Sequence, residues 1–296
     1  MRIDDIDALL AVVQYSSLSQ AAEHLGITQS AITRRLQSLE QSLGTQLLDR
    51  QTKPLRLTTV GQRVYQQCLT LKREARRLHA LANEAGEARG PLRLGLPQSL
   101  SELTLTRTLA GLKAHSAQAE VTVSCGWGDQ LLTRLENLDL DAMLAIGPAN
   151  LAIPDTLRAT RLRPLAVGVI VRQGMFSEGY PLSEVARLGW VVNPEGCGLR
   201  AGVIRYLEQQ GSAFKVNVES AGIHLQLELV ANGAGVGIVP LAVLENSPLR
   251  DSLQVIGREE YSPENYLWLL SAPDQGNLTP AIREFARLVS DQLPSG

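Results

Sequence analysis

A helix-turn-helix pattern close to the N-terminus constrains this chain more than any other feature of its sequence. Apolar residues recur at helical spacing over residues 4–15, and a second short helix is predicted to end at Gly26. Thr28 can cap a third helix, whose apolar face runs over residues 32–43 and which ends at Gly44. Two helices joined by a short turn that contains glycine are typical of DNA-binding modules. The opposite face of the third helix is polar, as a groove-reading surface requires.

A small β-wing and a long helix are predicted to follow. The segments 47–50 and 55–57 flank a turn at 52–54, and a long helix is predicted from Thr58 to about Glu84, where Gly86 and the pair Gly90-Pro91 would stop it. At 1.5 Å per residue this helix would be roughly 40 Å long. Its apolar positions alternate in steps of four and three, as a helix-helix seam does: Val64, Cys68, Leu71, Ala75, Leu78, Ala82 and Ala85. We expect a partner helix there; the alternative is packing against its own domain.

The remaining residues alternate between predicted strands and helices, which argues for an α/β unit with largely parallel sheets. Two hundred residues exceed one five-stranded sheet, so we expect two subdomains that share a cleft. The predicted strands are 92–96, 121–124, 142–146, 167–171, 190–193, 216–218, 237–239 and 267–270. The predicted helices are 100–114, 130–138, 199–210, 223–232 and 280–293.

The charge of the chain is distributed unevenly along it. The formal net charge of -2 and the isoelectric point of about 6.1 argue at first against a nucleic-acid binder. Residues 28–77, however, hold ten basic residues against three acidic ones, a net of +7. Residues 91–296 hold sixteen against twenty-one, a net of -5. The positive part therefore coincides with the helix-turn-helix, the wing and the long helix.

Several classes of function are not indicated. The three cysteines and four histidines are scattered, so neither a zinc site nor a disulfide framework is predicted. The first residues are acidic where a signal peptide would be basic, and no apolar run approaches the ~20 residues of a membrane span. We therefore expect a cytoplasmic protein that has no contact with a membrane.

The glycines Gly233, Gly235 and Gly237 do not indicate a dinucleotide site. That fingerprint needs a strand before the glycines and a helix after them, whereas here the predicted order is reversed. No G-x-S-x-G elbow is present, and neither Ser99 nor Cys197 has a base at motif spacing. We therefore predict no cofactor, no metal and no catalytic residues, and the chain is not expected to be an enzyme.

About fifteen spaced positions in residues 17–61 resemble the winged helix-turn-helix of the LysR-type transcriptional regulators. They are 17–22 (SLSQAA), Leu25, 28–33 (TQSAIT), 39–40 (LE), 43–44 (LG), 47–50 (LLDR), 57–58 (LT) and Gly61. The segments 138–142 (LDLDA) and 230–240 (VANGAGVGIVP) resemble later motifs of the same family. Leu48, Thr33 and Ser30 stand where that family commonly has Phe, Ser and Pro. These departures affect which bases are read rather than DNA binding itself.

The resemblance implies a division of the chain into three parts. Residues 1–58 would be the DNA-binding domain, 59–90 the dimerising linker helix and hinge, and 91–296 a two-lobed α/β effector domain like a periplasmic binding protein. Its first lobe would take about 91–164 and 267–296, and its second lobe about 165–266.

Candidate DNA contacts lie on the third helix and on the wing. Glutamine pairs with adenine and arginine with guanine in the major groove, whereas basic residues of the wing contact phosphates. A solvated helix face is the alternative for any one of them. The candidates are Thr28, Gln29, Ser30, Thr33, Arg34, Gln37, Arg50, Lys53 and Arg56.

Candidate effector contacts are loop residues at the carboxyl ends of predicted strands, where α/β folds bind ligands. Each could also be an ordinary loop residue. They are Gln98, Ser99, Leu100, Trp127, Gly147, Asn193, Cys197 and Arg200, and Arg200 could pair with a carboxylate.

Together these features predict a LysR-type regulator, a homodimer or homotetramer that binds a pseudo-palindromic promoter site on double-stranded DNA and responds to a small-molecule effector. RNA polymerase is an additional candidate partner. The alternatives are a solute-binding receptor, against which the absence of an export signal argues, and a DNA-tethered enzyme. The effector, the target promoters and the sign of regulation do not follow from the sequence.

Overall fold

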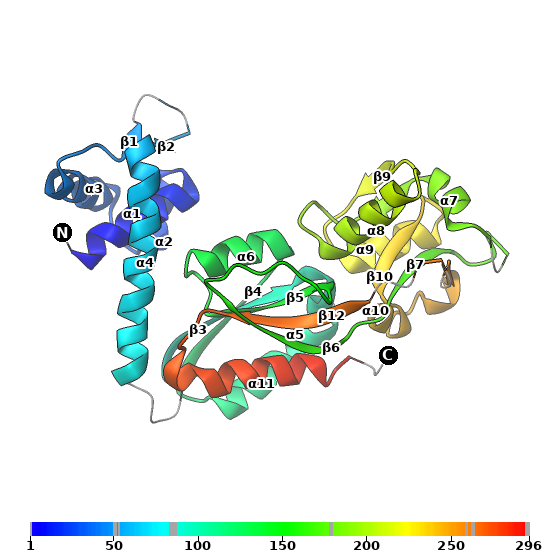
Figure 1. Ribbon diagram of the computed structural model, residues 1–296. Coiled ribbons are helices and arrows are strands. Elements are labelled where there is room, and N and C mark those ends of the chain that lie inside the picture. Colours follow the sequence, from blue (N-terminus) through cyan, green and yellow to red (C-terminus); the bar gives the residue numbers. More distant parts are fainter. Residues whose placement is uncertain are drawn as a thin grey trace. The chain divides into compact units, whose positions relative to one another are not determined.

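The computed structural model describes residues 2–49, 52, 54–82, 88–177, 180–257, 260–261 and 264–293, without the side chains of 76, 77 and 79–82. The chain forms two compact units, unit 1 (Met1–Ala82) and unit 2 (Asn83–Gly296) (Figure 1). Among the described residues, no helix combines the length and the apolar character that a membrane crossing needs. No three His, Cys, Asp or Glu side chains in the described part are grouped to hold a metal ion.

Unit 1 consists of a helical core, a two-stranded wing and a long helix. Its elements are α1 (Ile3–Tyr15), α2 (Leu18–His24), α3 (Gln29–Leu43), β1 (Leu48–Asp49), β2 (Arg56–Leu57) and α4 (Thr59–Ala82). Side-chain oxygens cap the N-termini of α2 and α3. Ser17 accepts from the amide of Gln20 at the start of α2, and Thr28 accepts from the amide of Ala31 at the start of α3. Gly44, in the left-handed conformation, ends α3. The predicted helix-turn-helix and wing are therefore confirmed.

The apolar stripe of α4 divides into two parts. Val64 and Cys68 pack into the core of unit 1 together with α1 and α3. Further along the helix, Leu71 and Leu78 remain 48% and 69% exposed. The predicted seam is thus partly wrong, because its N-terminal half is used inside unit 1. The side chain of Ala82 and all of Ala85 lie outside the described residues.

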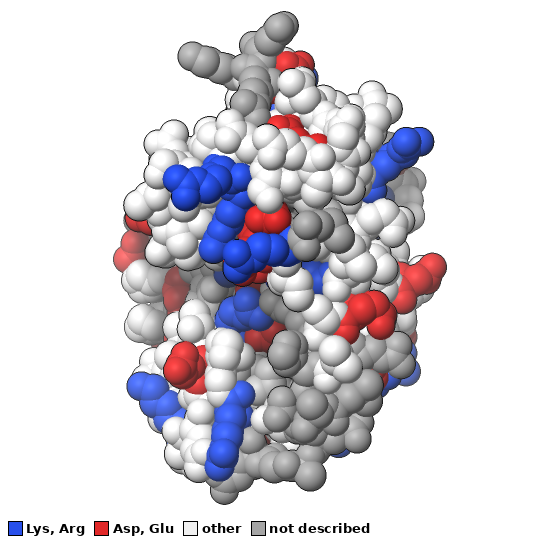
Figure 2. Space-filling model, turned by 90° about the vertical axis from the view of Figure 1, so that its left-hand side faces the viewer, with Lys and Arg blue, Asp and Glu red and all other residues white. Residues whose placement is uncertain are grey.

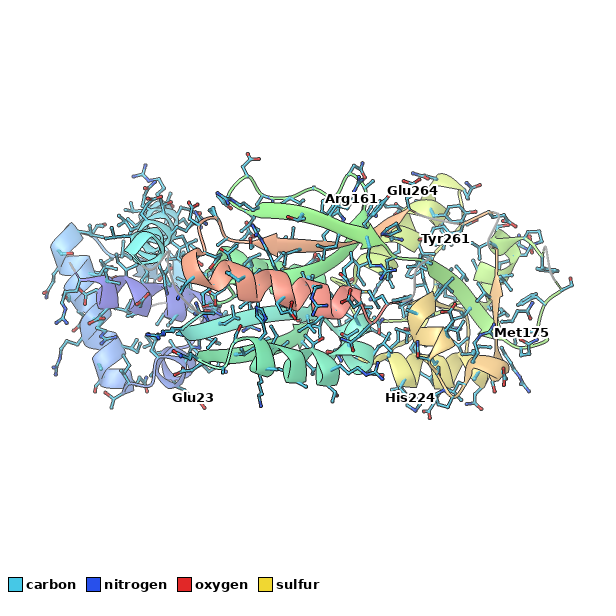
Figure 3. All side chains as sticks on the ribbon, turned by 90° about the horizontal axis from the view of Figure 1, so that it is seen from below. Glu23, Arg161, Met175, His224, Tyr261 and Glu264 are labelled. Atoms are coloured by element: carbon cyan, nitrogen blue, oxygen red, sulfur yellow. The ribbon has the colours of Figure 1, made fainter. Side chains whose placement is uncertain are left out.

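Unit 2 contains a first lobe built on a five-stranded sheet with the strand order β4-β3-β5-β12-β6. Helices α5 and α11 cover one face of the sheet and α6 the other, and Figure 3 shows α5 and α11 side by side. The strands are β3 (Gly90–Pro97), β4 (Ala119–Gly126), β5 (Ala142–Pro148), β6 (Arg158–Pro164) and β12 (Asn265–Ser271). The helices are α5 (Gln98–His115), α6 (Gly128–Glu136) and α11 (Thr279–Ser290).

The second lobe takes the chain between β6 and β12. It holds a three-stranded sheet of order β10-β7-β11 and the pair β8-β9, which a bridge from Trp190 to Val236 connects. The strands are β7 (Val167–Arg172), β8 (Trp190–Val192), β9 (Val216–Glu219), β10 (Gly237–Pro240) and β11 (Leu253–Ile256). The helices are α7 (Leu182–Val185), α8 (Gly198–Gln209), α9 (Ile223–Ala231) and α10 (Leu241–Glu245).

The prediction of largely parallel sheets is wrong. β3 pairs in parallel with β4 and β5, and β8 pairs in parallel with β9. β12 pairs antiparallel with both β5 and β6, and β7 pairs antiparallel with β10 and β11. The reason is the chain path: β12 re-enters the first lobe from the second lobe, so it runs opposite to the strands beside it. The strands β6 and β11 and the short helices α7 and α10 were not predicted.

Candidate DNA interface and effector pocket

The outer face of α3 gathers the predicted groove-contacting residues. Five of them line one shallow surface hollow: Gln29, Ser30, Thr33, Arg34 and Gln37. The opposite face, with Ile32, Leu36 and Leu39, is buried in the core of unit 1. This two-sided pattern fixes which side chains α3 can offer to a groove.

The hydroxyls on α3 are engaged in local hydrogen bonds. Thr28 Oγ1 lies 2.9 Å from Ser30 Oγ, and Thr33 Oγ1 donates to the carbonyl of Gln29 at 3.0 Å. Arg34 is exposed and makes no ion pair among the described residues. Its neighbour Arg35 instead lies 3.7 Å from Asp4. Arg34 is therefore the guanidinium of α3 that remains available for DNA.

The wing presents Arg56 at its surface, on β2 and opposite Asp49 of β1. Arg50 and Lys53, the other two predicted wing contacts, lie outside the described residues. Figure 2 shows lysine and arginine side chains on the face toward the viewer, with acidic groups between some of them. Sequence reasoning missed Glu40, whose Oε1 accepts from the amide of Leu47 at 2.8 Å and so ties α3 to the wing.

Unit 2 contains a pocket of about 510 Å³ between its two lobes. Its polar part is formed by the first residues of α5, α6 and α8, and its apolar part by residues of α6, β5, β12 and the loop after β5. The predicted effector residues Gln98, Ser99, Trp127, Gly147 and Cys197 all line it. This volume lies within the roughly 300–1,000 Å³ of ligand pockets.

Three predicted effector residues do not line this pocket. Leu100 is fully buried in the core of the first lobe. Asn193 is 3% exposed, and its amide donates to Gln226 at 3.3 Å. Arg200 donates to Glu219 at 2.6 Å and to the carbonyl of Asn193 at 3.1 Å. Arg200, in the first turn of α8, thus ties the loop before this helix to β9, and its guanidinium is already paired within the second lobe.

Two glycines, which have no side chain, allow the backbones of the two lobes to come into contact beside the pocket. A Cβ at Gly198 would lie 2.6 Å from the carbonyl oxygen of Ile146, and one at Gly128 would lie 3.2 Å from that of Gly196. The first distance leaves no space for a side chain, and the second is tighter than ordinary van der Waals contact. Trp127 of the first lobe packs with Cys197 and the apolar core of the second lobe. The pocket is therefore closed on this side by direct contact between the lobes.

The α5 and α9 helices form a second contact between the lobes. Glu102 Oε1 accepts from the amide of Ile223 at 3.2 Å, at the first residue of α9. A carboxylate at a helix N-terminus is favourable, because it satisfies a free amide and faces the positive end of the helix dipole. His224, the next residue of α9, points outward (Figure 3) and lies 3.3 Å from Glu228, so it takes no part in the pocket.

The thiol of Cys197 is buried at the start of α8, where burial raises its pKa. The amides of Leu199 and Arg200 and the charge of Arg200 act in the opposite direction, but desolvation outweighs them. The thiol is therefore neutral near pH 7 and is a weak nucleophile. All three cysteines are free, with Cys68 and Cys197 buried and Cys125 exposed.

Several pocket residues were not identified from the sequence. Met143 and Leu270 pair across β5 and β12, more than a hundred residues apart in the chain. Leu132 of α6 and Leu151 of the loop complete this apolar wall. Arg205 was detectable in principle, because it follows Gly198 and Ala201 on one face of α8, and all three line the pocket.

A helix-turn-helix unit that offers a polar helix face, combined with a two-lobed unit that holds a ligand-sized pocket, defines a DNA-binding regulator with an effector-binding domain. Two family models match the chain: the bacterial regulatory helix-turn-helix protein of the lysR family over residues 3–62, and the LysR substrate binding domain over residues 85–294. The chain belongs to the LysR family of transcriptional regulators.

Relatives and solved structures agree with this membership. The hydrogen peroxide-inducible genes activator of Haemophilus influenzae is 25% identical, over 100% of this chain and 98% of the relative. The dual regulator OxyR of Escherichia coli K12 is 22% identical, over 92% and 90%. A full-length OxyR variant from Pseudomonas aeruginosa has a TM-score of 0.69 at 19% identity, covering 98% of this chain and 94% of that one. CbnR complexed with its target DNA has a TM-score of 0.54 at 18% identity, covering 99% and 100%.

Proposed function

We propose that this regulator acts in the cytoplasm on a pseudo-palindromic promoter site, which it reads through the outer face of α3. The observation that carries the proposal is the division of α3 into two faces, with its apolar residues in the core of unit 1 and Gln29, Arg34 and Gln37 at the surface. Glutamine and arginine are the residue types that read adenine and guanine in the major groove. Thr28, Ser30, Thr33 and the wing residues Arg50, Lys53 and Arg56 would position α3 on the duplex.

The small-molecule effector is proposed to bind in the pocket between the lobes. Its proposed contacts are Asp129, Arg205, the apolar wall and the five predicted residues that line the pocket, which are Gln98, Ser99, Trp127, Gly147 and Cys197. An effector must favour one relative arrangement of the lobes, since a ligand with equal affinity for both shifts nothing. The contact between Glu102 and α9 is an interaction that such a shift would make or break.

A small-molecule effector is favoured over direct sensing of peroxide. The names of several relatives refer to hydrogen peroxide. A cysteine that senses peroxide must be a thiolate, because peroxide reacts with thiolates rather than thiols. In this chain Cys197 is 6% exposed, and burial raises its pKa. The raised pKa disfavours oxidation, whereas a pocket of about 510 Å³ suits an organic ligand.

The affinity for DNA should depend steeply on salt concentration, and Arg34 should contribute to the choice of base. With duplexes selected by the full-length protein from a random library, affinity should fall by about 10³-fold or more between 50 and 200 mM salt, since counterions are released from phosphates. Arg34→Ala should cost about 1–3 kcal/mol on the selected site and relax base choice at one position. Lys53→Ala should weaken binding to all sequences alike.

Fluorescence anisotropy on selected and scrambled duplexes measures both quantities. Arg187→Ala is the matched control, because this arginine is exposed, lies in unit 2 and pairs only with Glu184 among the described residues. Affinity that does not depend on salt, or an Arg34→Ala protein with unchanged base preference, would contradict the proposed reading by α3.

We further propose that α4 joins two copies of the chain, giving a homodimer or a homotetramer. Leu71 and Leu78 are seven residues apart, which places them on one face of the helix, and both are exposed in the single chain. The double variant Leu71→Glu with Leu78→Glu should shift the dimer to monomer at micromolar concentration, measured by analytical ultracentrifugation. Glu74→Gln, at an exposed position between them, is the control. A double variant with an unchanged sedimentation profile would refute a role of this face.

A further inference from the structure

Thr33 lies at the centre of the outer face of α3. Residues three or four positions apart are neighbours on a helix surface, and so are residues directly next to each other along the chain. The neighbours of Thr33 in this sense are Gln29, Ser30, Arg34 and Gln37, all exposed, and together the five residues line one shallow hollow. Thr33 is half-buried between them. A base edge that enters this hollow therefore meets Thr33.

The hydroxyl proton of Thr33 is already used within the helix. Its Oγ1 donates to the carbonyl of Gln29, four residues earlier, at 3.0 Å. A hydroxyl has one proton, so Thr33 has no donor left for a phosphate or for an acceptor on a base. Ser30 differs, because its Oγ lies 2.9 Å from Thr28 Oγ1 and either hydroxyl can be the donor. The groups that Thr33 still offers are its γ-methyl and the lone pairs of Oγ1.

The γ-methyl gives Thr33 a property that its neighbours on this face lack. Of the five described residues that line the hollow, Thr33 alone carries a methyl group. Thymine presents a methyl group at C5 in the major groove, and a threonine methyl is one of the apolar groups that contact it. An amino group of adenine or cytosine would instead have to reach Oγ1 beside the carbonyl of Gln29, to which Oγ1 is turned. The methyl is therefore the favoured reading group.

We propose that Thr33 reads one thymine in each half-site, through contact between its γ-methyl and the C5 methyl of the base. This inference rests on the proposed reading of DNA by α3, and it gives Thr33 a base-reading role in addition to positioning the helix. Burying one methyl group contributes about 0.8 kcal/mol, which corresponds to about fourfold in affinity. Thr33 thus adds a modest preference for thymine to the stronger hydrogen bonds expected from Arg34.

The first part of the test changes only methyl groups of the DNA. Each thymine of the selected site is replaced, one at a time, by deoxyuridine, which lacks the C5 methyl. Fluorescence anisotropy at one fixed salt concentration measures the affinity, since binding depends on salt. At one position of a half-site the loss should be about fourfold. At the same position 5-methylcytosine should bind about four times more tightly than cytosine, because it restores the methyl group.

The second part changes the two branches of the Thr33 side chain separately. Thr33→Ser removes the methyl and keeps the hydroxyl, whereas Thr33→Val keeps a methyl and removes the hydroxyl. The helix propensities of the three residues lie close together, so both variants should fold. Thr33→Ser should bind the selected site about four times more weakly and lose nothing further with deoxyuridine at the critical position. Thr33→Val should keep the fourfold loss with deoxyuridine. This lack of additivity identifies a direct contact.

Thr133→Ser is the matched control. Thr133 is exposed on α6 of unit 2, and its Oγ1 donates to the carbonyl of Asp129 at 2.9 Å, the same hydrogen bond to the residue four positions earlier. The variant therefore loses a methyl from an equivalent threonine outside the DNA-binding unit. It should leave the affinity for the selected site and the loss with deoxyuridine unchanged.

Several results would overturn the inference. They are a selected half-site without thymine, a deoxyuridine scan without effect, and a Thr33→Ser protein that still loses fourfold with deoxyuridine, because another residue would then contact the methyl. Loss of the preference in Thr33→Val alone would assign the reading to the hydroxyl. If Arg34→Ala relaxes base choice but the scan has no effect, α3 reads DNA and the methyl contact fails. If variants of neither residue change base preference, the proposed reading by α3 fails as a whole.

Discussion

Gly61→Ala is expected to destabilise unit 1 by about 3 kcal/mol and to lower DNA affinity at least tenfold. A Cβ at this position would overlap the backbone carbonyl oxygen of Leu47. Neither the carbonyl of Leu47 nor the backbone of Gly61 can move away easily, because both are held by hydrogen bonds. The Leu47 carbonyl accepts from the amide of Thr58 at 2.9 Å, and Thr58 Oγ1 in turn accepts from the amide of Gly61 at 2.9 Å. Overpacking of this kind costs about 1–3 kcal/mol or more, and a backbone neighbour puts the cost at the upper end.

Hydrogen exchange measures this effect separately in the two units. In the Gly61→Ala protein, the amides of α1 and α3 should exchange about a hundredfold faster, and those of β5 and β12 at the original rate. Gln62→Ala, at the next and exposed position of α4, serves as the control. Protection of α1 and α3 equal to that of the unsubstituted protein would show that the contact with Leu47 relaxes without cost.

Asp141→Ala is expected to lower the free energy of unfolding of unit 2 by about 3 kcal/mol. Asp141 is 4% exposed and accepts from three donors of Arg93: the amide at 2.8 Å, Nη2 at 2.9 Å and Nε at 3.3 Å. Alanine leaves the amide and the guanidinium of Arg93 without their acceptor, at the position where β3 and β5 meet. Loss of one partner of a buried pair costs about 3–5 kcal/mol, and the lower value applies because about a third of the Arg93 side chain is exposed.

Urea unfolding followed by tryptophan fluorescence reports on this change, since all three tryptophans lie in unit 2. Glu184→Ala removes an exposed ion pair to Arg187 in the same unit and should cost less than about 1 kcal/mol. Similar losses for the two variants would mean that burial does not strengthen the interaction of Asp141 with Arg93.

The parts of the fold that depend on neighbouring residues were predictable, and the parts that depend on distant strands were not. The turn at Gly26, the cap at Thr28 and the end of α3 at Gly44 are local, so the sequence pattern locates them. The position of β12 between β5 and β6 depends on pairing across more than a hundred residues. The polar, arginine-rich pattern of β6 gives no alternation of apolar residues, so that edge strand was missed.

The same distinction applies to the candidate sites. The polar outer face of α3 follows from helical periodicity alone. The pocket residues Met143 and Leu270 come together only through strand pairing. The sequence position of Arg200, at the end of a predicted ligand-binding loop, indicates an effector contact, but its partner Glu219 lies on β9. A paired arginine and a free one are identical in sequence, and only the fold distinguishes them.

The late position of β12 in the chain also affects how the protein is made. Translation supplies all of unit 1 and every strand of the second lobe before residue 265, and domains generally fold as units in the order of their synthesis. Until β12 emerges from the ribosome, the first lobe has a gap between β5 and β6, and the wall of the pocket lacks Leu270. A nascent chain therefore completes its DNA-binding unit before the unit that is proposed to sense the effector. A protein cut short before residue 265 would keep the first of these units and lose the second.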